Sequence, residues 1–261
     1  MNVAEAADLL LEAEAAAKDR EPLTDDWPEL DLATAYAIQD ETLGRRLARG
    51  ERLVGLKLGL TSVAKQRTMG IDRPLVAWLT DAMLLAPGAP IGTGLIHPRA
   101  EPEIVFVLGK RLEGPGVTAA EALGSVAAVY CGVEIIDSRF ADFRFKLPDV
   151  VADNASAARF ALGPVGVDPM SLDLSLEACL LQVDGDVVDS ATGAAVQGHP
   201  AQALAFGANT LAERGLALEA GWTVLTGGMT DAVPLPPGST LVAEFTHLGS
   251  VVLRSEALPQ P

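Results

Sequence analysis

The stretch HPRAEPEIVFVLG, residues 97–109, reads as a β-strand because a run of branched and aromatic residues is bounded by proline and glycine. Successive side chains of a strand point to opposite faces, so Glu101 and Glu103 should share one face, about 7 Å apart at Cα. Two carboxylates at this spacing can close on one cation. They could equally form the solvated face of an edge strand, which Pro102 would permit.

A third carboxylate, Glu134, lies within another apolar run, VYCGVEIID, residues 129–137. An isolated carboxylate is expensive to bury there unless a cation neutralises it. Oxygen ligands without a nearby histidine or cysteine suit Mg²⁺ or Mn²⁺ better than Zn²⁺. The sequence therefore predicts a divalent metal site made by Glu101, Glu103 and Glu134.

The pattern of residue types along the chain changes near residue 52. Before it, an Ala/Glu-rich stretch and a second segment after the turn signal DDWPE favour helices. After it, short β-branched runs bounded by glycine and proline predict strands. Besides the two runs above, these are RLVGLKLGL (52–60), CLLQVDGDVVDS (179–190), WTVLTGG (222–228) and TLVAEFTHLGSVVLRS (240–255).

Turn and capping residues refine this pattern. Asp184-Gly185 is a hairpin signal, and Thr118 with Glu121 forms a capping box at a helix start. Another helix should run from Pro200 to near Gly215. The sequence thus predicts an α+β protein, with a small helical N-terminal region at residues 1–52 and a β-rich metal-binding catalytic domain at residues 53–261.

Composition argues against several classes of protein. No apolar run reaches the ~18 residues of a membrane span, and the N-terminus is acidic where a signal peptide is basic. We therefore expect a soluble, cytoplasmic protein with no membrane partner. The formal net charge of −16 argues against binding to nucleic acid. Cys131 and Cys179 lack metal-type spacing, which predicts buried free thiols.

A net charge of −16 would also repel an anionic substrate at long range. The local field must then be reversed by the metal and by cationic residues, of which the candidates are Lys57, Arg99, Arg139, Arg144 and Lys146. Lys57 lies in GLKLGLTS (55–62), where it could face an anion or point to solvent from an edge strand. The turn that follows, with Thr61 and Ser62, offers N–H groups and hydroxyls that suit a carboxylate.

The remaining polar cluster is Asp153-Asn154-Ala155-Ser156, a combination typical of a turn or a helix N-cap. The three histidines are far apart and show no ligand spacing. Neither G-x-x-x-x-G-K-[ST] nor G-x-G-x-x-G occurs, so no motif favours nucleotide binding.

Several segments, in this order along the chain, resemble one family. They are GLKLGLTS, LTDAM, HPRAEPEIVFVLG, VEIIDSRF, KLPDVVADNAS, GAAVQGHPA, TGGMTDAVPLPPG and LGSV. The family is that of the 2-keto-4-pentenoate hydratases and 4-oxalocrotonate decarboxylases, a branch of the fumarylacetoacetate hydrolase superfamily. The similarity runs from about Leu53 to the end of the chain.

The resemblance assigns roles to particular residues. It implies that Glu101, Glu103 and Glu134 bind Mg²⁺ or Mn²⁺, and that Lys57 and Asp81 are catalytic. It implies a substrate pocket that is lined by Thr61, Ser62, Arg139, Asp153, Asn154 and Ser156. It also implies a mostly antiparallel sheet that is rolled around the site.

Within the family, the segment DSRFADFRFKLPDVVADNASAARF (137–160) and GHPA (198–201) are more similar to the decarboxylases. The implied reaction is decarboxylation of 2-oxo-3-hexenedioate, a dicarboxylic 2-oxo acid, to 2-hydroxypenta-2,4-dienoate, with the metal as electron sink. Arg139, Arg144 and Lys146 all stay open as the residue that meets the distal carboxylate.

Other functions stay open alongside this one. The nearest alternative is a hydratase of 2-hydroxypenta-2,4-dienoate. A second alternative is a C–C bond hydrolase or a keto acid tautomerase on the same metal scaffold. A different class is a non-catalytic partner subunit, which the intact carboxylates and Lys57 argue against. The resemblance further implies a homo-oligomer and a possible complex with a hydratase of the same family.

Overall fold

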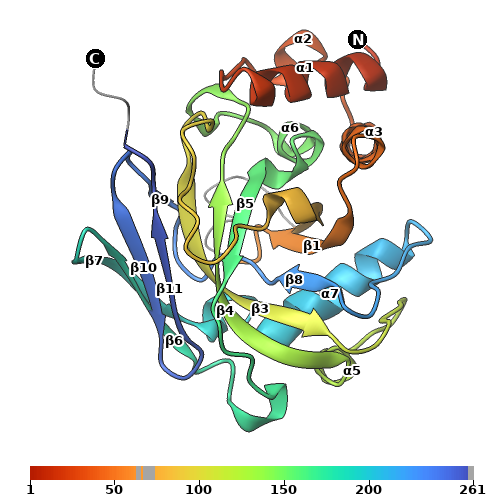
Figure 1. The fold of residues 1–261 in the computed structure, drawn as a ribbon. Coiled ribbons are helices and arrows are strands. Elements are labelled where there is room, and N and C mark those ends of the chain that lie inside the picture. Colours follow the sequence, from red (N-terminus) through yellow and green to blue (C-terminus); the bar gives the residue numbers. More distant parts are fainter. Residues whose placement is uncertain (63–65, 67–73, 258–261) are drawn as a thin grey trace.

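The computed structural model describes residues 1–62, 66 and 74–257, and its N-terminal part is helical (Figure 1). The chain begins with α1 (Val3–Ala15), α2 (Leu23–Asp26) and α3 (Leu32–Ala48). Asn2 and Asp31 cap α1 and α3 by accepting hydrogen bonds from backbone N–H groups of the first turn. Helix gives way to strand between Ala48 and Leu53, and the division into domains at residue 52 stays a prediction.

The larger sheet has the strand order β2-β1-β8-β3-β4-β5, with β9 paired to β3. All described pairs are antiparallel except β1 with β8, so the predicted mostly antiparallel sheet is confirmed. Its strands are β1 (Leu53–Gly59), β2 (Leu75–Thr80), β3 (Arg99–Leu108), β4 (Val126–Ile136), β5 (Ala157–Leu162), β8 (Thr223–Leu225) and β9 (Val233–Pro234).

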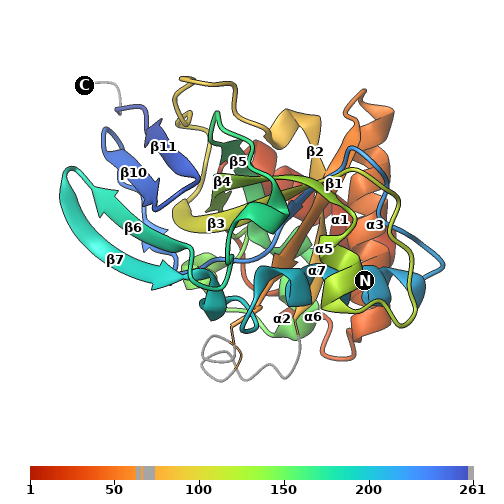
Figure 2. The same ribbon diagram turned by 90° about the horizontal axis from the view of Figure 1, so that it is seen from below.

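A smaller sheet has the order β11-β10-β6-β7 and lies on the side of the molecule away from α1 and α3 (Figures 1 and 2). Its strands are β6 (Ala178–Val183), β7 (Asp186–Thr192), β10 (Thr240–Phe245) and β11 (Gly249–Arg254). The predicted hairpin between β6 and β7 is confirmed. Asp184 and Gly185 both have positive φ, at 53° and 91°, as a two-residue type I′ turn requires.

The remaining helices are short, apart from α7. They are α5 (Ala119–Leu123), α6 (Leu147–Ala152) and α7 (Pro200–Ala212), with 3₁₀ turns η1 (Asp81–Met83), η2 (Ala141–Phe143), η3 (Asn154–Ser156), η4 (Pro169–Ser171) and η5 (Gly193–Ala195). The capping box of Thr118 and Glu121 is present, and α7 begins at Pro200 as predicted. Within the described residues, no helix combines the length and apolar character that a membrane crossing requires.

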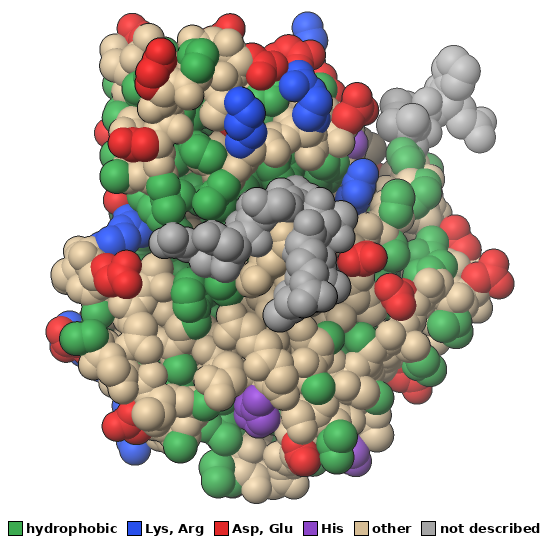
Figure 3. Space-filling view, turned by 180° about the vertical axis from the view of Figure 1, so that it is seen from behind, with side chains coloured by type: hydrophobic (Ala, Val, Ile, Leu, Met, Phe, Trp, Pro, Cys, Tyr) green, Lys and Arg blue, Asp and Glu red, His purple; other side chains and the backbone are tan. Residues whose placement is uncertain are grey.

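The core is continuous between the two sheets. Leu181 and Leu241 of the smaller sheet share one buried cluster with Ile104 and Val133 of the larger sheet. A second buried cluster joins the N-terminal helices to β2 and α6. The face in Figure 3 carries both acidic and basic side chains, most of them near its rim.

Candidate metal centre and cavity

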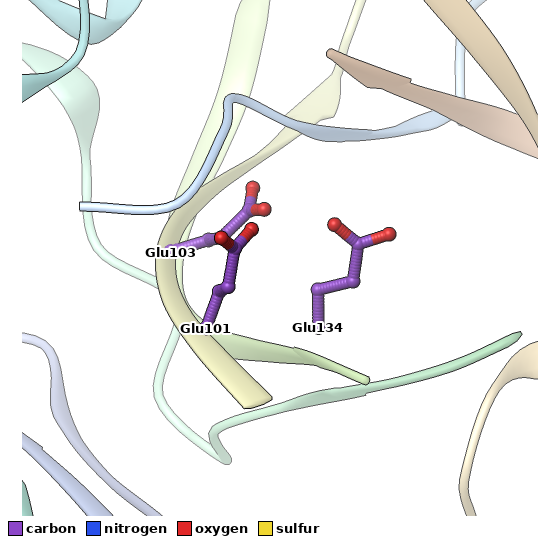
Figure 4. Close-up of side chains that lie close together, drawn as sticks. All are labelled: Glu101, Glu103 and Glu134. Atoms are coloured by element: carbon purple, nitrogen blue, oxygen red, sulfur yellow. The ribbon is translucent and has the colours of Figure 1, made fainter. Parts of the chain in front are cut away.

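The three predicted ligands meet because β3 and β4 are antiparallel neighbours. Their register places Glu101 opposite Glu134, and Glu103 points to the same face two residues along β3. One carboxylate oxygen from each residue lies within 4.8 Å of the other two. In Figure 4, Glu101 and Glu103 stand side by side and Glu134 faces them. The predicted spacing is therefore present.

These carboxylates are too deeply buried to be a solvated face. Glu103 is 0% exposed and Glu134 is 1% exposed. Gly227 donates its N–H to Glu103 Oε2 at 2.7 Å, but Glu103 Oε1 and Glu134 Oε2 have no hydrogen-bond partner among the described residues. Unpaired buried carboxylate oxygens are costly. The edge-strand interpretation of Glu101 and Glu103 is wrong, because β3 runs between β8 and β4.

Burial also shifts the proton affinity of the site. It raises the pKa of Glu103 well above its usual range, and the charges of Glu134 and Glu101 raise that pKa further. Burial raises the pKa of Glu134 as well, while Lys57 opposes that rise. A divalent cation bound to all three carboxylates would supply the missing positive charge, and their oxygen-only donor set fits Mg²⁺ or Mn²⁺.

Lys57 is the cation that the structure does provide. Its Nζ lies 2.8 Å from Glu134 Oε1 and donates a hydrogen bond to Ala155 O at 2.8 Å. The side chain is buried and β1 is not an edge strand, since it lies between β2 and β8, so the solvent-facing interpretation of Lys57 is wrong. Three successive left-handed residues, 154–156, form the turn that presents the Ala155 carbonyl.

A cavity of about 540 Å³ opens beside this cluster. Its polar lining residues include Lys57, Thr61, Arg99, Glu101, Ser156 and Asp231. Its apolar walls include Leu75, Ile136, Phe143, Phe145 and Val150. Of the residues expected at the substrate, Lys57, Thr61 and Ser156 therefore meet at one cavity together with a metal ligand.

Other expected substrate residues are used within the protein. Arg139 is buried and forms an ion pair with Asp153, and it also donates to Asp137 O at 2.7 Å and Ala157 O at 3.2 Å. Asn154 accepts from Trp78 N and donates to Trp78 O, at 2.8 and 2.9 Å. Neither Arg139, Asp153 nor Asn154 is among the described residues that line the cavity.

Asp81 and Ser62 also lie outside the described cavity lining. Asp81, in η1, accepts hydrogen bonds from Arg52 N and Nε, both at 2.8 Å. This places Asp81 at the opposite end of β1 from the turn that carries Ser62. The structure therefore does not bring Asp81 to the metal cluster.

Among the candidate cations named from the sequence, Arg99 is one to which the family resemblance gave no role. Arg144 is exposed and pairs with Glu21 and Asp25, and Lys146 is exposed at the start of α6. Arg99 instead lines the cavity. It precedes Glu101 by two residues on β3, so the alternation that paired the glutamates also predicts that Arg99 shares their face of the strand.

Comparison with known proteins places this architecture in a family. Residues 56–254 match the model of the fumarylacetoacetate hydrolase C-terminal domain. The chain belongs to the fumarylacetoacetate hydrolase family. It is an enzyme of that family, and the resemblance noted in its sequence is confirmed.

Relatives in this family carry two kinds of name. A 4-oxalocrotonate decarboxylase from Pseudomonas sp. (strain CF600) is 42% identical over 93% of this chain and 92% of its own. A 2-hydroxyhexa-2,4-dienoate hydratase from Comamonas testosteroni is 43% identical over 92% of each chain. These two relatives, one named as a decarboxylase and one as a hydratase, are thus similar to this protein to nearly the same degree.

One solved family member is very similar in structure. It is the 4-oxalocrotonate decarboxylase from Pseudomonas putida G7, complexed with magnesium and adipate. The TM-score is 0.94 at 40% identity, and the alignment covers 97% of each chain.

Proposed function

We propose that this protein is a divalent-cation-dependent decarboxylase that converts 2-oxo-3-hexenedioate to 2-hydroxypenta-2,4-dienoate and CO₂. The observation that carries the choice is the place of Arg99. It lies two residues from Glu101 on one strand, so about 7 Å separates their Cα atoms along β3. A cation at that distance from the metal ligands suits an acid with a carboxylate at each end.

Glu101, Glu103 and Glu134 would hold Mg²⁺ or Mn²⁺. When bound there, the cation supplies a Lewis acid that withdraws electrons from the 2-oxo acid group of the substrate. Lys57 neutralises Glu134 and lines the cavity. An ammonium has three N–H donors, so after its contacts with Glu134 and Ala155 one remains for the substrate carboxylate.

Thr61 and Ser156 would orient the same end of the substrate. Both line the cavity, and both are buried. The Ser156 hydroxyl donates to Asp153 at 3.2 Å, which leaves its oxygen free to accept. Leu75, Phe145 and the other apolar walls would exclude water from the chain of the substrate.

Decarboxylation requires fewer catalytic groups in the cavity than hydration does. The distal carboxylate must lose its charge as CO₂ leaves, so a tight ion pair would stabilise the ground state and slow the reaction. Arg99 is half-buried, which limits the strength of such a pair. Hydration also requires a proton donor at carbon and a positioned water.

The second candidate is 2-hydroxypenta-2,4-dienoate hydratase. Asp231 favours it, because this exposed carboxyl also lines the cavity and could position a water. The 43% identical hydratase of C. testosteroni supports it equally. The homo-oligomer, the complex with a related hydratase and the cytoplasmic location stay predictions.

The two candidates separate in one experiment. The purified protein, loaded with Mg²⁺, is given 2-oxo-3-hexenedioate or 2-hydroxypenta-2,4-dienoate, and CO₂ release and dienol absorbance are followed. We expect CO₂ from the first substrate and little loss of the second. Efficient consumption of the dienol with the dicarboxylate untouched would establish the hydratase instead. Glu103→Gln serves as the control, because it should lose bound metal and turnover together while the fold survives.

A further inference from the structure

Arg99 and Phe143 form a wall between two cavities. The guanidinium carbon of Arg99 lies 4.2 Å from the centroid of the Phe143 ring, a cation–π contact. Both residues line the cavity that holds Glu101, and both also line a second cavity of about 510 Å³. No ion pair joins Arg99 to a carboxylate of any described residue. The aromatic ring is therefore its main described support.

Phe143 is itself held by residues next to β3 and β4. Its ring lies 4.7 Å from that of His97, at an interplanar angle of 31°. His97 Nε2 lies 2.8 Å from Ser138 O, and since a carbonyl only accepts, Nε2 carries a proton. The Asp137 carboxylate accepts from the N–H groups of Ile96 and His97, at 2.8 and 2.7 Å. This network fixes the ring that supports Arg99.

The backbone at Phe143 is also unusual. Asp142 and Phe143 have φ of 56° and 55°, in the left-handed region that side chains other than glycine rarely adopt. Such conformations persist only where the surrounding contacts enforce them. Here they place the Phe143 ring between His97 and Arg99 at the edge of the cavity.

We propose that Phe143 is a specificity-determining residue, which holds Arg99 as the end wall of the catalytic cavity. The wall selects a six-carbon 2-oxo acid with a second carboxylate, and it keeps longer chains out of the second cavity. This inference rests on the proposed function and names how that site recognises the far end of its substrate. Phe143 acts through Arg99, so its loss should affect the distal carboxylate and leave the metal end unchanged.

The test measures binding to the Mg²⁺-loaded protein by calorimetry, with saturated ligands that do not react. 2-Oxohexanoate and 2-oxohexanedioate differ only in the distal carboxylate, and 2-oxooctanedioate is two carbons longer. We expect the unmodified protein to prefer the six-carbon diacid to the monoacid at least about tenfold. Phe143→Leu should reduce that preference about threefold to tenfold, because it weakens binding of the diacid more than binding of the monoacid. Phe143→Ala should in addition bind the eight-carbon diacid more tightly.

Phe145→Leu is the matched control, because Phe145 lines the same cavity and its ring makes no cation–π contact with a described residue. It should leave the preference for the diacid unchanged, as should Phe143→Tyr, which keeps an aromatic face beneath Arg99. The inference is overturned if Phe143→Leu keeps the full preference, or if it weakens both six-carbon ligands equally. It is also overturned if Phe143→Tyr loses the preference as fully as a non-aromatic residue does.

The assay of CO₂ release separates this inference from the proposed function. Decarboxylation by the unmodified protein, with a preference that Phe143→Leu leaves intact, would sink the inference alone. A protein that releases no CO₂ and binds both six-carbon ligands equally would overturn both.

Discussion

Replacing Lys57 with methionine tests how the buried charges of the site are balanced. Methionine keeps most of the length and apolar surface of lysine and removes only the ammonium. Nζ of Lys57 lies 2.8 Å from Glu134 Oε1, and both side chains are almost fully buried. The substitution removes the ion-pair partner of Glu134, which stays buried beside Glu101 and Glu103.

The expected loss depends on whether metal is bound. Removing one partner of a buried ion pair costs about 3 kcal/mol or more, so the metal-free variant should lose about that much stability. In the Mg²⁺-loaded protein the metal itself neutralises Glu134. What remains is the lost hydrogen bond to Ala155 O, worth about 1 kcal/mol. By linkage, the variant should bind Mg²⁺ more tightly by the difference of about 2 kcal/mol.

Urea unfolding with excess Mg²⁺ and with a chelator measures both losses, and calorimetry measures Mg²⁺ affinity directly. Lys110→Met is the control, since Lys110 is exposed and its replacement should change stability by less than about 0.5 kcal/mol. An equal loss for Lys57→Met with and without metal would refute the proposed charge balance. So would a variant that binds Mg²⁺ more weakly than the unmodified protein.

Two further predictions concern neighbouring groups. Gly227 has φ of +111° and donates its N–H to Glu103, and an added Cβ would lie 2.0 Å from Thr61 Oγ1. Gly227→Ala should therefore weaken Mg²⁺ binding about tenfold. Gly116→Ala is the control, because Gly116 has φ of +90° and no atom within 4 Å of an added Cβ, and it should leave Mg²⁺ binding unchanged in the same titration. Burial raises the pKa of Cys131 to about 11 and the pKa of Cys179 to about 12, so little thiolate is present at pH 8. A thiol reagent should therefore label neither cysteine until the protein unfolds. Rapid labelling of the folded protein would contradict this prediction.

The features that the sequence predicted correctly are those that residues close together in the chain determine. Alternation along β3 identified the pair Glu101 and Glu103, and the apolar setting of Glu134 identified the third ligand. The β6–β7 hairpin and the cap at Thr118 followed from turn and capping residues. The free, buried state of both cysteines is also confirmed.

The features that the sequence analysis missed are determined by contacts between segments far apart in the chain. All six residues of β2 are buried, so the strand shows no alternation, and β5 is rich in alanine. The roles of Asp153 and Asn154 depend on a left-handed turn that their residue types only suggest. Arg139 was expected at the substrate, but only the fold reveals that its donors are used by Asp153 and two carbonyls.

The environment of Lys57 is the clearest example of a feature that residues nearby in the sequence do not determine. Its sequence context is compatible with an edge strand, because nothing local indicates that β2 will pair along one side of β1 and β8 along the other. The sequence analysis placed Lys57 at the substrate, and the ion pair with Glu134 gives it a role in stability as well.

The contact between Asn154 and Trp78 has a consequence for solubility. β2 is the last strand of its sheet, and a bare outer strand offers unpaired N–H and C=O groups to which another chain can add. Asn154 pairs with both backbone groups of Trp78, and Gln39 donates to Val76 O at 3.1 Å. Two side chains thus take the place of a missing strand. The turn that presents a carbonyl to Lys57 thus also occupies backbone groups of β2 to which another chain could add.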